Sequence, residues 1–431
     1  MLDRSPQYSW WIVGLLLLIS LIGYLDRLVL SFLIDPIKAD LGLSDTDMGV
    51  LSGMAFALFY VLMGVPMGRW VDTRNRRNLL AGCVALWSVM TAACGAAISF
   101  TTLFLARVGV GIGEAALNPA AVSMIGDLFP REKIARPLGI FSLGVYLGGG
   151  VALMLGGEIV ARVSELGALE IPVIGAVAPW RAVFLLVGAP GLAAALLLLL
   201  TAREPRVKRE VVHSAPSWRE VLGFAQTHRR FFAPLFLGLV AFGFNIYSIL
   251  GWYPAMLMRT YGVSPAEVAW SYGVVYLIAG VAGGVSVGWV IEWLHARSIG
   301  AAPVTLCMVS MVVMLLTSAV APLLPTITAC VAVTALTVFV WALTTSAAYA
   351  TLVQVLPERM RGVGVGFYMV IMNVTGGAFG TVIVGLLCDH VFGAAGLRYA
   401  LVAMAAVALP VSVLAFARAR TPYHCLASQP A

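Results

Sequence analysis

Long apolar stretches separated by short polar ones run through the whole chain, and their lengths predict its secondary structure. Each stretch holds about twenty predominantly apolar residues, which is the length at which an α-helix crosses the hydrocarbon core of a bilayer. The pattern predicts an all-α membrane protein with short loops. Its twelve transmembrane helices are predicted at residues 8–34, 47–70, 78–98, 101–122, 136–160, 181–202, 231–257, 267–291, 301–322, 326–351, 362–388 and 397–417.

The composition favours a membrane protein over a soluble one. Hydrophobic residues make up 61% of the 431 positions and charged residues 11%, whereas a soluble domain averages roughly 45–50% and about 25%. A soluble fold could not hide so much apolar surface from water, so a soluble enzyme and a secreted disulfide scaffold are both excluded. The six cysteines are scattered, with no spacing typical of a metal site or a disulfide framework, and we expect no metal and no cofactor.

Positive charge is distributed unevenly over the predicted loops. Twenty of the 27 Lys and Arg residues fall on the same side as the two termini, and five fall on the opposite side. Cytoplasmic loops carry such an excess, so both termini are predicted to be cytoplasmic. The net charge of +7 therefore reflects topology, and no nucleic-acid partner is expected.

The predicted helices divide into two halves. We predict an N-terminal six-helix bundle at 1–202, a charged cytoplasmic linker at 203–230, and a C-terminal six-helix bundle with a short tail at 231–431. The end of the second helix, Gly64-x3-Gly68-x3-Asp72, is echoed at Gly284-x3-Gly288-x3-Glu292 in the eighth. Two similar halves are typical of transporters that bind substrate between them near the middle of the bilayer.

The loop after the second helix carries the motif GRWVDTRNRR, residues 68–77. A glycine here lets helices approach closely, and a carboxylate at the helix end can accept hydrogen bonds from a neighbouring helix N-terminus. On this motif the chain resembles the major facilitator superfamily, which implies the major facilitator fold. The alternative is that the arginines only hold the cytoplasmic surface. The resemblance implies gating roles for Gly68, Asp72, Arg74, Arg76 and Arg77, and for Gly288 and Glu292 in the degenerate second copy.

The four charged residues best placed within the bilayer all lie in predicted helices of the first half: Asp26, Arg27, Arg107 and Glu114. A charge at mid-membrane costs roughly 2.5–3.5 kcal/mol on the insertion scale and usually marks a transport pathway. Arg107 and Glu114 are two helical turns apart and share a face. Asp26 and Arg27 are adjacent, so their side chains diverge and one of them is predicted to reach another helix. A proton or substrate site and a permanent ion pair both stay open as explanations.

The second half has no charge at the membrane core. Its candidate substrate-binding residues are polar or aromatic: Asn245, Tyr247, Tyr368 and Asn373. A charged wall in one half and an aromatic, apolar wall in the other suit an amphiphile, with its ionic head against the first half. Hydrogen bonding between helices is the alternative explanation for the two amides.

Three stretches together are similar to the Spinster family: GYLDRLVLSFLIDPIKADLGLSD (23–45), GVGIGEAALNPAAVSMIGDLFP (109–130) and APWRAVFLLVGAPG (178–191). Spinster proteins are lipid carriers, and bacterial relatives are thought to be proton-coupled. The resemblance implies that Asp26 and Glu114 carry protons, that Arg27 senses the substrate head group, and that Arg107 pairs within the first half. The Tyr-x-Asp-Arg element and the Gly-Glu pair also occur among anion:cation symporters, which carry sugar acids.

These observations predict a transporter rather than an enzyme. We expect proton-coupled alternating access for an amphiphilic substrate of lysophospholipid or sphingoid-phosphate type, with a symporter of small organic anions as the alternative. A membrane-embedded enzyme would need a nucleophile and base within the membrane, and no in-helix His lies beside Ser or Cys. Short loops and a short tail fit a bacterial member, and we expect a monomer in the bacterial inner membrane, with protons, the substrate and the bilayer as its partners.

Overall fold

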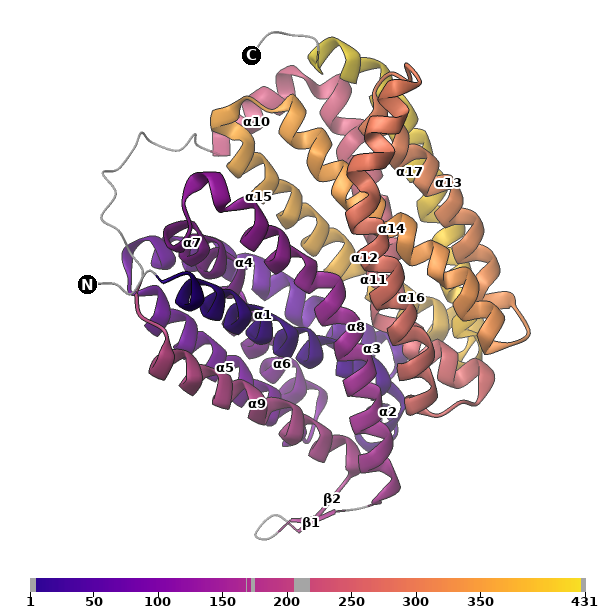
Figure 1. Cartoon of the computed structure of the whole chain (residues 1–431). Helices are drawn as coiled ribbons and strands as arrows, with labels where there is room; N and C mark the ends of the chain where they lie inside the picture. Colours follow the sequence, from indigo (N-terminus) through magenta and orange to yellow (C-terminus); the bar gives the residue numbers. More distant parts are fainter. Residues whose placement is uncertain (1–4, 168, 172–174, 205–217, 428–431) are drawn as a thin grey trace. The chain divides into compact units, whose positions relative to one another are not determined.

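The computed structural model describes residues 5–167, 169–171, 175–204 and 218–427. Within these ranges twelve helical segments are long and apolar enough to cross a membrane, and each coincides with one predicted from the sequence (Figure 1). The prediction of twelve spans is confirmed. The spans are Pro6–Phe32, Asp45–Thr73, Arg76–Gly95, Phe100–Leu128, Ala135–Glu165, Pro179–Thr201, Arg229–Tyr261, Pro265–Ala296, Ala302–Leu323, Ile327–Val355, Glu358–Phe392 and Ala394–Tyr423.

Several spans consist of more than one helix, because turns interrupt them. The α-helices are α1 (Pro6–Leu28), α2 (Ile34–Leu41), α3 (Asp45–Gly49), α4 (Ala55–Thr73), α5 (Arg76–Gly95), α6 (Phe100–Glu114), α7 (Leu117–Leu128), α8 (Ala135–Glu165), α9 (Pro179–Thr201), α10 (Trp218–Thr227), α11 (Arg229–Tyr261), α12 (Pro265–Ala296), α13 (Ala302–Val320), α14 (Ile327–Val355), α15 (Arg361–Ile371), α16 (Thr381–Leu387) and α17 (Leu397–Ala427).

A short antiparallel hairpin is the one departure from an all-helical chain in the described ranges. Strands β1 (Leu169–Ile171) and β2 (Gly175–Val177) pair between α8 and α9, with Glu170 opposite Ala176. The rest of the regular structure is helical, as the apolar pattern predicts.

The described residues form two compact units that do not coincide with the predicted halves. The first contains residues up to 204 together with Gly251–Leu277, and the second contains Trp218–Leu250 and the chain from Ile278 onward. The last part of α11 and the first part of α12 therefore belong with the first unit. The division at 203–230 stays a prediction, and residues 205–217 of that linker lie outside the described ranges.

Local signals set the helix starts around the first unit's polar residues. Ser44 caps α3 by accepting from the Asp47 amide at 3.0 Å, and the Asp47 carboxylate accepts from the Ser44 amide at 3.0 Å. Ser99 caps α6 in the same reciprocal way with Thr102. Such caps satisfy amides that have no partner inside the helix, and they determine where each span begins.

The fourth span is interrupted next to Glu114, one of the candidate functional residues. Helix α6 ends at Glu114 and α7 begins at Leu117. Pro119 has no N–H to donate to the carbonyl of Ala115, so the α-helical hydrogen-bond series cannot run through this point. A π-helical turn at Val50–Met54, before α4, interrupts the second span, and another at Met372–Gly380 follows α15.

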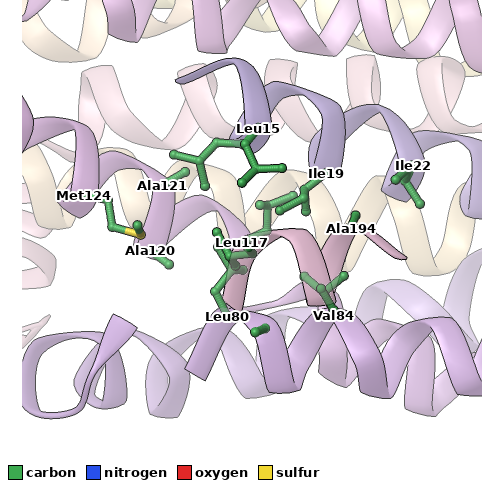
Figure 2. Close-up of a cluster of buried hydrophobic side chains, with 14 of the residues drawn as sticks. Leu15, Ile19, Ile22, Leu80, Val84, Leu117, Ala120, Ala121, Met124 and Ala194 are labelled. Carbon is green, nitrogen blue, oxygen red and sulfur yellow. The ribbon is translucent and has the colours of Figure 1, made fainter. Parts of the chain in front are cut away.

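A hydrophobic core joins helices of the first unit, among them α1, α5, α7 and α9. Figure 2 shows Leu15 and Ile19 of α1, Val84 of α5, Leu117 of α7 and Ala194 of α9 turned toward one another. Small side chains in α7 and α9 let these helices approach, and the packing determines which face of each helix is left for polar residues.

Glycines on α8 allow close contacts on two sides of that helix. A Cβ at Gly148 would lie 3.0 Å from the Tyr24 ring of α1, and one at Gly149 would lie 2.7 Å from the Tyr276 ring of α12. No larger residue fits between these helices without displacing a neighbour.

Candidate functional site

An ion pair between α1 and α6 lies at the centre of the candidate site. The Arg27 Nε donates to Glu114 Oε2 at 2.6 Å, and its Nη2 contacts the same oxygen. Gly23, one turn before Arg27, packs against this carboxylate, and a Cβ there would lie in ordinary van der Waals contact with Oε2 at 3.4 Å. The prediction that Asp26 or Arg27 reaches another helix holds in the structure for Arg27.

Three aromatic rings surround the Arg27 guanidinium. Its Cζ lies 4.5 Å from the centre of the Phe56 ring, 5.1 Å from that of Tyr60 and 5.5 Å from that of Tyr24. Aromatic faces attract a cation and replace part of its hydration. The Arg27 side chain is 26% exposed and that of Glu114 0%, so the carboxylate lies behind a guanidinium that is open on one side.

Asp26 is buried without a hydrogen-bond partner. Its exposure is 0%, and neither carboxylate oxygen is hydrogen-bonded by any residue that the structure describes. Oε1 of Glu114 and the hydroxyl of Thr91 are also buried, and neither makes a hydrogen bond with a described residue. An ionised carboxylate in such surroundings costs several kcal/mol unless it is paired, so a protonated Asp26 is far less costly.

Arg107 binds backbone rather than a carboxylate. It is 1% exposed, and it donates from Nη1 to the carbonyl of Asp26 at 3.2 Å and from Nε to that of Leu51 at 3.4 Å. Leu51 lies in the π-helical turn, which presents its carbonyl to this side chain. No ion pair joins Arg107 to Glu114 in the described chain, and the predicted substrate role of Arg107 stays a prediction.

A second buried cation lies in the 68–77 loop motif. Arg76 is 2% exposed and forms ion pairs with Asp127 at 2.8 Å and Glu204 at 2.7 Å, and its Nη1 donates to the Ser123 hydroxyl at 2.7 Å. Its position in a polar loop suggested a surface charge as the alternative to gating. Arg76 is instead enclosed by acidic residues, one at the end of α7 and one shortly after α9, and its gating role stays a prediction.

The other residues of the motif are more open. Arg74 is exposed over the Trp70 ring, and Arg77 donates to the Ala202 carbonyl at 3.3 Å. Asp72 is exposed and, over the described ranges, makes neither a hydrogen bond nor an ion pair. Nothing lies within 4 Å of the position of a Cβ at Gly68. The close helix contact and the helix-terminus hydrogen bond expected from the sequence are therefore not made in this structure.

The degenerate copy of the motif is equally open. Gly288 and Glu292 on α12 are exposed, and a Cβ at Gly288 would meet no atom within 4 Å. Their gating roles, like those of the first copy, stay predictions.

The polar candidates of the second half form contacts within the second unit. The Tyr247 hydroxyl donates to Asn373 Oδ1 at 3.0 Å, which joins α11 to the π-helical turn after α15. Asn245 donates to the Ser318 hydroxyl of α13 at 3.4 Å, and Tyr368 is 2% exposed. Hydrogen bonding between helices, the alternative considered for the amides, is thus observed for both, and substrate binding by these residues stays a prediction.

Sequence reasoning missed two polar residues next to Arg27. Asn118 of α7 donates from Nδ2 to the Tyr60 hydroxyl at 3.0 Å, and the Tyr60 ring lies against the guanidinium. Asn118 lies one turn after Glu114, a spacing that could have indicated it. Tyr60 is one aromatic residue in an apolar helix, and nothing in the sequence distinguishes it.

An ionic cluster at the predicted outer end of the first unit was also missed. Arg259 of α11 bonds Asp35 at 2.6 Å and Asp45 at 2.8 Å, and Lys38 bonds Asp45 at 2.5 Å. The cluster ties the end of α11 to α2 and α3 within one unit. Its sequence signal is the short acidic and basic stretch 35–45, whose partner 214 residues away in sequence could not be foreseen.

The site combines a cation with buried carboxyl groups. An open arginine can receive a carboxylate or phosphate, and two buried carboxyls lie beside it. Across the described ranges no group of three or more His, Cys, Asp or Glu side chains is placed to hold a metal ion.

The chain is similar to known membrane transport proteins. The model of the family described as Major Facilitator Superfamily matches residues 16–381. An MFS-type efflux pump of Mycolicibacterium smegmatis is 35% identical over 304 residues, which are 68% of this chain and 65% of that protein. This match therefore spans less than two thirds of the relative. A hexuronate transporter of Bacillus subtilis is 26% identical over 415 residues, covering 90% of this chain and 89% of the relative.

A solved structure is similar along nearly the whole chain. It is the crystal structure of a bacterial homolog to the human lysosomal transporter Spinster, in an inward-facing and unoccupied conformation. The TM-score is 0.78 and the sequence identity 28%, with 98% of each chain covered.

Proposed function

Because the chain belongs to the major facilitator superfamily, we propose that it moves an amphiphilic, lipid-like anion across the membrane by proton-coupled alternating access. The chain is an integral multi-pass membrane protein with the fold of these transporters, and its predicted likeness to Spinster proteins is confirmed. The substrate class, the proton coupling and the roles of individual residues are the proposal.

The observation that carries the proposal is the Arg27–Glu114 pair. Glu114 uses a single oxygen to bind both Nε and Nη2 of Arg27. Protonation of Glu114 removes the charge that holds the guanidinium, so an anionic substrate can take its place. A ligand shifts such an equilibrium only by its different affinity for the two states, and here the proton and the substrate anion favour the same one.

Asp26 is proposed as a second proton carrier. Its buried carboxyl has no partner among the described residues, so a change of its charge alters the energy of the first unit strongly. Arg107 holds the backbone of Asp26 and leaves the carboxyl unbound. A proton at Asp26 and a proton at Glu114 therefore act on the same end of α1.

The lipid-like substrate class is supported by the Spinster likeness and by the aromatic surroundings of Arg27. Rings from Phe56, Tyr60 and Tyr24 provide apolar surface directly beside a cation. An amphiphile has an anionic head for the guanidinium and apolar atoms for the rings.

A symporter of small organic anions is the second candidate. The hexuronate transporter of Bacillus subtilis aligns over 90% of this chain, and a sugar acid also presents a carboxylate to Arg27. This candidate shares the proposed proton coupling and differs in the substrate.

Flux into proteoliposomes under an imposed pH gradient tests the proposal. Purified protein is given a lysophospholipid in one arm and glucuronate in the other. We expect gradient-driven flux of the lysophospholipid that is lost in the Glu114→Gln and Asp26→Asn variants. Glu165→Gln, an exposed glutamate at the end of α8, is the matched control and should transport normally. Flux of glucuronate alone would favour the second candidate, and normal, pH-dependent flux in both variants would exclude the coupling mechanism.

A further inference from the structure

Tyr60 and Asn118 form a polar pair that reaches Arg27 through the Tyr60 ring, which lies against the guanidinium. The Asn118 Nδ2 donates to the Tyr60 hydroxyl oxygen at 3.0 Å, which joins α7 to α4. The Tyr60 ring is fixed from two directions, since it stacks on Phe56 at 5.5 Å and lies 5.1 Å from the Arg27 Cζ. The pair is therefore positioned by the same packing that positions the guanidinium.

The pair keeps hydrogen-bonding capacity that the protein does not use. Tyr60 accepts the bond from Asn118, so its own O–H remains a donor, and Asn118 still has a carbonyl oxygen and one N–H. Neither side chain makes another hydrogen bond with the described residues, and Asn118 is exposed. The phenol O–H, the remaining amide N–H and the amide oxygen together offer two donors and one acceptor.

A hydroxyl group is the ligand chemistry that matches this arrangement, because a hydroxyl both donates and accepts. A phosphate or carboxylate oxygen could accept from both donors and would leave the Asn118 oxygen without a partner. In the proposed function Arg27 binds the anionic group of the substrate. Tyr60 and Asn118 are therefore suited to bind the group next to that anion.

We propose that Tyr60 and Asn118 form a hydroxyl-binding subsite beside Arg27, so that the preferred substrate carries a hydroxyl group next to its anionic group. The inference rests on the proposed function in one respect, namely that Arg27 receives the anion. The same chemistry occurs in a lysophospholipid, where the glycerol hydroxyl neighbours the phosphate, and in a sugar acid, where ring hydroxyls neighbour the carboxylate.

Binding to purified full-length protein, measured by calorimetry, tests the subsite with two pairs of ligands. One pair is 1-acyl-glycerol-3-phosphate and its analogue without the free hydroxyl, and the other is 2-hydroxycyclohexanecarboxylate and cyclohexanecarboxylate, so that the members of each pair differ by one hydroxyl next to the anionic group. For the ligand source that the site accepts, we expect the wild type to bind the hydroxylated member roughly threefold to tenfold more tightly, the effect of about one net hydrogen bond.

Tyr60→Phe removes the donor and keeps the ring. In this variant the preference for the hydroxylated member should fall to about one, while the affinity for the hydroxyl-free member stays unchanged. Asn118→Ala should reduce the preference in the same direction. Tyr349→Phe, an exposed tyrosine on α14, is the matched control and should keep the wild-type preference.

The outcomes separate this inference from the proposed function. If Tyr60→Phe leaves the preference intact, or weakens both members of a pair equally, the subsite is wrong even though anion binding at Arg27 survives. If the wild type binds no member of either pair, the proposed function fails and the subsite fails with it. The pair that shows the preference identifies the source of the hydroxyl.

Discussion

Two arginines of the first unit, Arg76 and Arg27, differ in how completely they are paired. Arg76 is enclosed by Asp127, Glu204 and the Ser123 hydroxyl, so its charge is matched by two carboxylates. Arg27 has one carboxylate, which uses a single oxygen, and its remaining surroundings are aromatic rings and open space. A fully matched cation stabilises one arrangement, whereas a partly matched one can exchange its partner. We therefore expect Arg76 to act mainly on stability, and the open surroundings of Arg27 support its proposed exchange of partners.

Removing Arg76 should have the largest effect on stability. The Arg76→Met variant leaves Asp127 and Glu204 without their cation, and breaking a buried pair from one side costs about 3–5 kcal/mol. We expect a large fall in the melting temperature in detergent. Arg74→Gln, in the same loop but exposed, should change stability by less than about 0.5 kcal/mol. Equal melting temperatures for the two variants would contradict the structural role.

Removing Arg27 should act on binding more than on stability. Loss of a hydrogen bond to a charged group costs about 1.5–3 kcal/mol, so Arg27→Gln should weaken substrate binding roughly 10-fold to 100-fold. The fold is expected to tolerate the change better than Arg76→Met, because Glu114 can take up a proton once its partner is gone. Parallel melting and binding measurements check this. A variant that melts as early as Arg76→Met would remove the distinction between the two arginines.

A smaller effect on stability is expected at the contact between α4 and α6, next to the aromatic rings around Arg27. A Cβ at Gly111 of α6 would lie 2.6 Å from the Phe56 carbonyl oxygen of α4, so Gly111→Ala should separate these helices and cost about 1–3 kcal/mol through overpacking. Gly68→Ala, where a Cβ meets no atom within 4 Å, is the matched control for stability. If melting shows that both substitutions are tolerated equally, α4 and α6 are not held in contact at this point.

Much of the fold and part of the site follow from the sequence. Twelve spans could be predicted because twenty apolar residues have one stable state in lipid, and Asp26, Arg27, Arg107 and Glu114 could be identified because a charge in an apolar helix is costly. Their partners could not be predicted. Arg27 and Glu114 are 87 residues apart, and whether Glu114 meets Arg27 or Arg107 depends on the rotation of packed helices.

The burial of Arg76 and the position of Tyr60 could not be predicted either, because both depend on segments that are distant in the sequence. Arg76 lies in a polar loop, and its neighbours in sequence say nothing of Asp127 and Glu204 at the ends of other helices. Tyr60 has no sequence signal at all, because an aromatic side chain in a membrane helix is usual. Its importance comes from its position against Arg27 and Asn118.

The pH dependence of substrate affinity tests the central claim, that a proton on Glu114 frees Arg27 for the substrate anion, most directly. Calorimetry on the wild type should show tighter binding as the pH falls, because protonated Glu114 no longer competes for the guanidinium, and proton uptake should accompany binding. In Glu114→Gln the competitor is absent at every pH, so binding should be tight throughout and this pH dependence should flatten. Equal pH dependence in the wild type and Glu114→Gln would contradict the account.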